Sequence, residues 1–282
     1  MSSDAQSAPD EKGGAANEMV EIVKTIAYAL LIALVLRVLL FQPYTIPSAS
    51  MEPNLFEGDY IIVSKYSYGY SKHSIPFSPP LFNGRIFNHA PRRGDIIVFK
   101  LPREPSIDYI KRLIGMPGDK VQVKSGVVFI NGKPVKRERI APGVTDLGDG
   151  LIAPVDRFKE TNPEGRDYTT NSSPSNQAAD NTGVYVVPPH CYFMMGDNRD
   201  NSLDSRFDPG MPFEATGPSN CGWDPSVDAF VPDEKGVGFV PEQNLEGRAQ
   251  IILLSWKKGA SLFKPWTWVM NAQPSRFFRI LK

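Results

Sequence analysis

The sequence predicts a mainly β protein, in which one N-terminal transmembrane helix precedes an antiparallel β domain with a smaller, variable β-containing insertion. One long apolar stretch, Thr25 to Phe41, provides the helix. Beyond it, short apolar runs alternate with turn residues among the chain's 26 prolines and 23 glycines, which favours strands and loops over a helical bundle. Asn131-Gly132 lies between two β-rich runs and is a strong hairpin signal.

We assign residues 19–41 to the membrane anchor and residues 1–18, which are polar and lack an apolar period, to a disordered cytoplasmic tail. Arg37 interrupts the apolar stretch one turn from its end, where a long side chain can reach the membrane interface. A cleaved secretory signal is the alternative, because residues 46–50 resemble a small-x-small cleavage site. Cleavage there would remove or expose Ser50, the candidate nucleophile discussed below, so we favour a retained anchor.

The orientation of the anchor is only weakly encoded. The flank before it holds Lys12 and Lys24 but more acidic than basic residues, so the positive-inside signal is small. A large downstream domain is exported regardless of its charge. We expect the N-terminus in the cytoplasm and an extracytoplasmic β domain, partly from the family resemblance given below.

The family resemblance given at the end of this section implies that the exported part divides into a main β domain, residues 42–124 and 193–260, and a variable second region, residues 125–192. Within the second region, residues 137–183 are polar and predict an irregular insertion. Within the main domain, residues 207–236 predict a second, loop-rich insertion. The expected strands are 58–64, 95–100, 107–114, 120–124, 127–130, 134–136, 184–187, 192–195, 238–241 and 250–256.

The C-terminal tail, residues 261–282, mixes aromatic and basic residues, and Pro265 and Pro274 preclude one long helix. Trp266 and Trp268 beside lysine and arginine suit a membrane interface, and packing on the core explains them equally well. Both interpretations remain open.

Composition argues against several functional classes. Lys+Arg and Asp+Glu are 31 each, so no basic excess indicates nucleic-acid binding. We expect no metal or other cofactor, because the histidines and cysteines match no metal-ligand spacing: His73, His89, His190, Cys191 and Cys221. A disulfide between the two cysteines requires an oxidising compartment, and the sequence does not decide whether it forms.

Ser50 is a candidate nucleophile close to the membrane. It follows Phe41 by nine residues, so it lies at most about 30 Å from the end of the apolar stretch. A serine hydroxyl needs a base to take its proton, and no histidine is near in sequence. A Ser-x-x-Lys pattern at Ser255–Lys258 falls in an expected strand, and we attribute it to chance.

Lys111 is the candidate base. A free lysine has a pKa near about 10.4, and burial among apolar groups lowers it by up to about 3–5 units. Strand alternation places Lys111 on one face with Tyr109 and Leu113, while Arg112 faces the other side. The alternative is an ordinary charged residue that protects an edge strand.

A third polar segment, residues 194–206, is dense in acidic residues but lacks the glycine and glutamate of an EF-hand in any frame. Asp204 and Arg206 can pair there, and its serine hydroxyls can orient a neighbouring amine. Together with five other segments it resembles the bacterial type I signal peptidase (leader peptidase) family of membrane-anchored Ser/Lys-dyad proteases. The matching segments, in the family's order, are IPSASMEPNL (46–55), GDYIIVSKYSYG (58–69), RRGDIIVFK (92–100), DYIKRLIGMPGDKV (108–121), MMGDNRDNSLDSR (194–206) and GFVPEQNLEGRA (238–249).

The resemblance implies that Ser50 is the nucleophile and Lys111 the general base of an acyl-enzyme reaction. It implies an oxyanion hole made by the Ser50 backbone N–H and the Ser48 hydroxyl. Ser202 would orient the Lys111 amine, and an ion pair between Asp204 and Arg206 would support it. The implied substrate groove, with shallow pockets for small side chains, includes four further residues: Ile46, Leu55, Tyr109 and Ile110.

The implied activity is removal of signal peptides from exported preproteins without a metal or cofactor. The implied partners are preproteins and the lipid bilayer, and the implied location is the bacterial inner membrane, with one span and a periplasmic catalytic domain. The chain departs from the family in having one convincing span, an unusual 207–236 insertion and a different cysteine spacing. A specialised pilus or conjugation-protein peptidase and a non-catalytic anchored binding domain are the alternatives.

Overall fold

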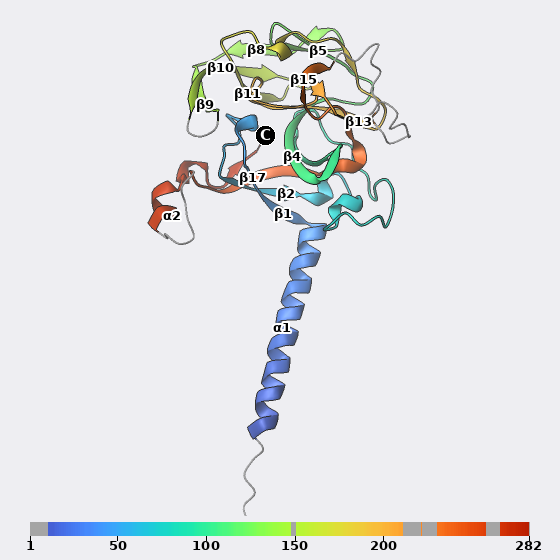
Figure 1. Ribbon diagram of the computed structural model, residues 1–282, viewed down its shortest axis with the longest axis vertical. Helices are drawn as coiled ribbons and strands as arrows, with labels where there is room; N and C mark the ends of the chain where they lie inside the picture. Colours follow the sequence, from blue (N-terminus) through green and yellow to red (C-terminus); the bar gives the residue numbers. More distant parts are fainter. Residues whose placement is uncertain (1–10, 148–150, 211–220, 222–229, 258–265, 282) are drawn as a thin grey trace, which may run out of the picture.

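The computed structural model describes residues 11–147, 151–210, 221, 230–257 and 266–281. Helix α1, Glu11–Leu39, projects from one end of a β-rich body (Figure 1). Its Asn17–Leu39 part has a mean hydropathy of 2.2 and is not buried by the rest of the chain, as a lipid-facing helix requires. Residues 11–18, which we expected in the disordered tail, are helical, because a helix nucleated in the apolar run propagates into neighbouring residues. Residues 1–10 lie outside the described part.

The body is organised around an eight-stranded antiparallel sheet in the order β1-β2-β17-β3-β4-β13-β16, with β18 paired to β17. The mainly β, antiparallel prediction is therefore confirmed. The strands are β1 Phe41–Thr45, β2 Asp59–Ser64, β3 Ile96–Leu101, β4 Glu104–Gly115, β13 Cys191–Met195, β16 Val240–Pro241, β17 Leu245–Ser255 and β18 Arg279–Ile280. Strand β1 follows α1 almost directly, so the sheet starts at the end of the anchor (Figure 1).

Strand β3 shows how this sheet is held between two layers. Its continuous apolar run sends Ile96 and Val98 into one buried cluster and Ile97 and Phe99 into another. A strand without polar alternation is expected where both faces of a sheet are covered. The first cluster also contains Met51, from the short 3-10 helix η1, Ala49–Met51, between β1 and β2.

Residues 137–183 are not an irregular insertion, as we expected, but carry much of a second antiparallel sheet. The reason is that several inward positions of its strands are polar, such as Glu160, which is buried and paired with Arg199. The strands are β8 Lys136–Arg139, β9 Gly143–Asp146, β10 Ile152–Thr161 and β11 Asp167–Ser172. A neighbouring sheet, including the expected hairpin, has β5 Lys120–Lys124, β6 Val127–Ile130, β7 Lys133–Pro134 and β12 Tyr185–Val186. Both lie at the end of the body away from α1 (Figure 1).

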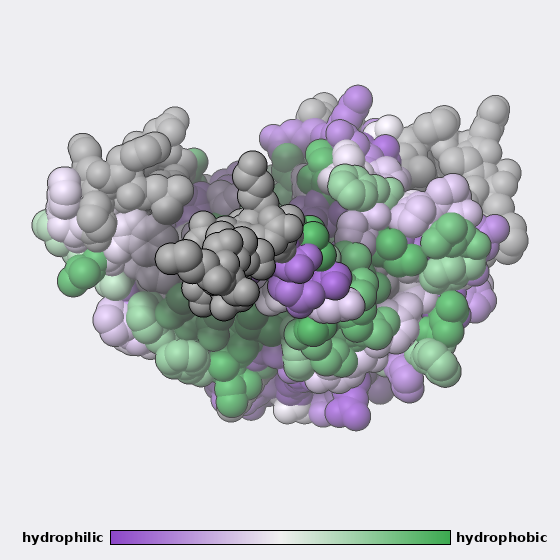
Figure 2. Space-filling model, turned by 90° about the horizontal axis from the view of Figure 1, so that it is seen from below, coloured by the Kyte–Doolittle hydropathy of each residue, from purple (hydrophilic) through white to green (hydrophobic). Residues whose placement is uncertain are grey.

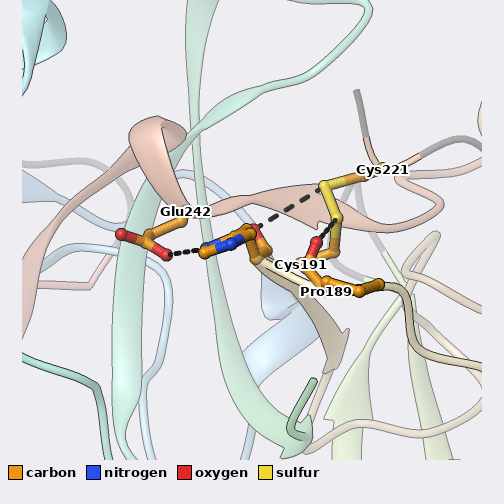
Figure 3. The surroundings of a disulfide bond; sticks show 5 residues. Pro189, Cys191, Cys221 and Glu242 are labelled. Carbon is orange, nitrogen blue, oxygen red and sulfur yellow. Dashed lines mark hydrogen bonds and ion pairs between the residues drawn. A yellow bond between two sulfur atoms is a disulfide. The ribbon is translucent and has the colours of Figure 1, made fainter. Parts of the chain in front are cut away.

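The 207–236 insertion is fastened at both ends. Strands β14, Phe207–Asp208, and β15, Val231–Lys235, pair in parallel. A disulfide joins Cys221 to Cys191 at the start of β13, which answers the question that the sequence left open (Figure 3). Residues 211–220 and 222–229 lie outside the described part.

The C-terminal tail packs on the sheet through Arg276 and Leu281, which are buried, and through β18. Helix α2, Trp266–Asn271, instead leaves Trp266, Val269 and Met270 exposed. Core packing therefore explains the end of the tail, and the membrane interpretation stays a prediction for α2. Residues 258–265 and 282 lie outside the described part.

Candidate active site

Ser50 sits in η1, and its neighbours hold it in place. Ala49 and Met51 are buried on either side, so the short helix is anchored in the core while Ser50 faces a cavity. The Asn198 backbone N–H donates to the Ser50 carbonyl at 3.1 Å, and the Asn198 side chain donates to the Ala49 carbonyl at 3.1 Å. The 194–206 segment thus fixes the backbone of the nucleophile loop.

Lys111 is the first buried residue of β4, whose earlier residues are exposed or half-buried. Its side chain contacts Ser50 at the cavity. Its Nζ is 2.7 Å from Ser50 Oγ, although the two residues are 61 positions apart in sequence. Lys111 is 4% exposed. Burial lowers its pKa to about 8, which Asp204 and Asp197 partly oppose and Arg206 reinforces. A lysine with this pKa can act as a base near neutral pH.

Arg112 faces the opposite side of β4, as strand alternation predicts. It forms a buried bidentate pair with Asp197, with N–O distances of 2.7 and 2.8 Å. Asp197 also accepts from the Asn54 side chain at 2.7 Å, which connects β4 to the residues that follow η1. Asp197 was not predicted as a site residue, because its partners are distant in sequence.

Asp204 and Arg206 form the expected ion pair at 2.8 Å, and both are buried. Asp204 also accepts from the Gly196 backbone N–H at 2.9 Å. This carboxylate is held ionised, because Arg206 and the backbone donors lower its pKa although its burial, the largest single influence, raises it. The Lys111 amine is therefore influenced by a fixed negative charge on Asp204.

Ser202 lines the cavity, but the hydrogen bond that we expected from it to Lys111 is not present. Its Oγ is buried and has no hydrogen-bond partner within the described chain. The close approach of Ser202 depends on Gly196, where an added Cβ would lie 2.3 Å from Ser202 Oγ and 2.6 Å from the Ser50 carbonyl oxygen.

The cavity has a volume of about 670 Å³ and is open to solvent. Tyr109 and Ile110 line it, as expected, whereas Ile46 and Leu55 do not. Those two side chains are buried in the core beneath η1, because the chain turns there to bring Ser50 to the surface of the cavity. Their expected contact with substrate stays a prediction, and in this structure they pack in the same core cluster as Met51 of η1.

Ser48, the expected second oxyanion donor, is exposed at the mouth of the cavity with its Oγ 3.3 Å from Ser50 Oγ. The 207–236 insertion also contributes Phe207 and Glu234 to the lining, which was not predicted from the sequence. In the described part of the chain, no three His, Cys, Asp or Glu side chains are grouped so that they could hold a metal ion.

Comparisons with known proteins identify the family of the chain. The family model described as "Signal peptidase, peptidase S26" matches residues 19–256. A signal peptidase I of Rickettsia typhi is 38% identical over 273 residues, with 90% of each chain covered. One of Rickettsia canadensis is 44% identical over 275 residues, with 92% of each chain covered. A solved signal peptidase I structure from Enterococcus faecalis is 26% identical, and the match covers 57% of this chain and 97% of the Enterococcus chain. Its TM-score of 0.28 is too low for a comparison of folds.

The family match includes α1 from residue 19 onward, so the apolar helix is part of the family pattern and anchors the protein in a membrane. The family model spans most of the chain, and curated relatives match over nine-tenths of its length. The chain belongs to the signal peptidase family, peptidase S26.

Proposed function

We propose that the protein is a signal peptidase I, a serine endopeptidase that cleaves N-terminal signal peptides from exported preproteins. The names of the curated relatives support the activity. The observation that carries the mechanism is the 2.7 Å approach of Lys111 Nζ to Ser50 Oγ in a site where burial lowers the pKa of the lysine to about 8.

In the proposed reaction, neutral Lys111 takes the proton of Ser50 as Oγ attacks the scissile carbonyl carbon. The Ser50 backbone N–H and the Ser48 hydroxyl stabilise the resulting oxyanion. Protonated Lys111 then gives its proton to the leaving amine, which departs with the mature protein and leaves the signal peptide esterified to Ser50. Finally, Lys111 deprotonates a water molecule, which hydrolyses this ester and restores the serine.

The supporting residues act through Lys111 in this proposal. Asp204, paired with Arg206, supplies the charge that stabilises the ammonium after proton transfer. Ser202 Oγ provides a hydrogen-bond partner for that ammonium. Tyr109 and Ile110 shape shallow pockets for small side chains at the −1 and −3 positions of the substrate.

We further propose a single span in the bacterial inner membrane, with the N-terminus in the cytoplasm and the β body in the periplasm. The direct connection from α1 to β1 and η1 supports a site near the bilayer, because it leaves little chain between the anchor and Ser50. A substrate that is itself tethered to the membrane would reach such a site without leaving the surface.

The test is cleavage of a preprotein with an Ala-x-Ala site by the detergent-solubilised full chain, beside Ser50→Ala and Lys111→Ala. We expect cleavage after the last alanine by the wild type only, and a loss of at least about 10⁴-fold in either variant. Cleavage that survives in both variants would contradict the Ser/Lys mechanism. Capture without cleavage by folded wild type would favour the binding-domain alternative, and cleavage of only a pilus or conjugation protein would favour the specialised peptidase.

A further inference from the structure

A second cavity, of about 800 Å³, lies beside the end of the membrane anchor. Leu34 and Arg37 of α1 form one side of it, and Lys65 and Lys100 lie on the side of the body. It is separate from the substrate cavity, although Asp108 on β4 contributes to both. The catalytic reaction described above uses none of the cations in it.

The polar part of this cavity has more positive than negative charge. Lys65 lies 3.5 Å and Lys100 lies 3.6 Å from the buried carboxylate of Glu246, and Lys100 is also 2.6 Å from Asp108. The two carboxylates are thus engaged by the two lysines. Arg37 is exposed and forms no ion pair with a residue in the described part of the chain, so its guanidinium is accessible to an anion.

His73 also lines the cavity and is buried, and the positive charges around the cavity affect its protonation. Its pKa is lowered to about 4, first by burial and then by the charges of Lys72, Lys100 and Arg85. The imidazole is therefore neutral at physiological pH and does not add to the charge. An anion that entered the cavity would meet a positive potential there.

The other wall of the cavity is apolar. Leu34 of α1 faces Ile75, Pro76 and Phe77, which form a loop after the short helix η3, Lys72–Ser74. Phe77 is fully exposed, at 103% of its reference area, which is unfavourable in water and favourable in lipid. Seen from the side of the anchor, this face of the molecule carries several hydrophobic patches (Figure 2).

We propose that this cavity binds a membrane phospholipid, with the phosphate between Arg37 and Lys100 and an acyl chain along Leu34 and Phe77. The depth fits, because Arg37 lies one turn from the end of α1, where an arginine side chain reaches the headgroup level. Guanidinium and ammonium groups form strong charge-assisted hydrogen bonds with phosphate oxygens. The proposal rests on α1 as a membrane anchor and is independent of the proteolytic reaction.

Native mass spectrometry of the full chain in dodecyl maltoside, a detergent without phosphate, tests this. Titration with phosphatidylglycerol should give one lipid that binds more tightly than the rest. Arg37→Gln should raise the dissociation constant of that lipid by at least about tenfold, since it removes the unpaired cation. Phe77→Ser should weaken binding less, and by loss of acyl-chain contact alone.

Lys24→Gln is the matched control, because Lys24 lies near the other end of the same helix, exposed and paired with Glu21 at 3.1 Å. It should bind the lipid as the wild type does. Equal affinities of wild type and Arg37→Gln would overturn the proposal, and so would inorganic phosphate that displaces the lipid at equal concentration, which would indicate a free-phosphate site. Preprotein cleavage in the same detergent should be unchanged in Arg37→Gln, so a failure of the lipid site and a failure of the proposed protease are distinguishable.

Discussion

Two lysines of this protein, Lys111 and Lys65, are both almost completely buried, yet their surroundings give them different chemistry. Burial lowers the pKa of each. Lys65 lies 3.5 Å from the Glu246 carboxylate and donates to the Ser74 carbonyl at 3.2 Å. Lys111 has no carboxylate within ion-pair distance among the described residues, and its close neighbour is the Ser50 hydroxyl. The partner, and not burial, separates a structural cation from a candidate base.

The comparison also shows where the negative charge is placed. Glu246 contacts the lysine that it neutralises, whereas Asp204 acts on Lys111 from a distance and is itself paired with Arg206. Direct contact with a carboxylate would oppose the loss of the proton from Lys111. Asp204 does not contact Lys111 directly, so the Lys111 amine can lose its proton. The Asp204 carboxylate still stabilises the ammonium that forms during the reaction.

The largest expected effect comes from replacing each lysine with methionine, a side chain of similar length without charge. Lys111→Met should lower the cleavage rate by at least about 10⁴-fold. It should also raise the free energy of unfolding at pH 7, because it removes a buried amine whose desolvation destabilises the fold. Lys65→Met should keep cleavage within about tenfold but lower the free energy of unfolding by up to about 3 kcal/mol, since Glu246 loses one of its cations. Cleavage rates and urea denaturation of both variants measure this contrast.

One outcome would contradict the different roles assigned to Lys65 and Lys111. If Lys65→Met removed activity from folded protein as completely as Lys111→Met does, the difference in partners would not explain the difference in roles. Circular dichroism of each variant, recorded before the assay, separates a loss of fold from a loss of chemistry.

The next effect concerns Ser202. A buried hydroxyl without a hydrogen bond is uncommon and needs an explanation. We expect that its partner appears during the reaction, when Lys111 carries the serine proton and needs an acceptor. Ser202→Ala should therefore lower kcat by about 10- to 100-fold with little change in KM or in stability, while Ser202→Thr should retain most activity if the larger side chain fits. A fall in stability that matched the fall in kcat would assign Ser202 to packing instead.

How much of the fold the sequence predicts depends on what the strands bury. Strand β3 and the β5–β6 hairpin were predicted from their apolar residues, and the structure contains them. Strand β10 was missed because Glu160 is one of its buried positions, and its partner Arg199 lies in a distant loop. Strand β17 was predicted too short for the same reason, since its first residues include the buried Glu246.

The candidate site divides in the same way. Ser50 and Lys111 were identified as a candidate nucleophile and its base from the chemistry of a serine near the anchor and a lysine in an apolar strand, and the family resemblance favoured this pair over the structural alternatives. Asp197 and Glu234 were missed, because an acidic residue in a loop gives no sign of whether it is buried or faces a cavity. Both are positioned by tertiary structure: Asp197 by its pairing with Arg112, and Glu234 by the packing of the 207–236 insertion.

The smallest expected effect is a shift of the pH profile, and it tests the role of Asp204 directly. Cleavage by the wild type should rise with pH as Lys111 loses its proton, with a midpoint near the pKa of about 8. Asp204 raises the pKa of Lys111 and Arg206 lowers it, so Asp204→Asn, which leaves Arg206 unpaired, should move the midpoint to lower pH, by about one unit. The double variant Asp204→Asn/Arg206→Gln removes both charges and should move it less. A midpoint that did not move, or that rose, in Asp204→Asn would mean that this ion pair shapes the loop but does not set the pKa of Lys111, which would then depend on burial and on Asp197.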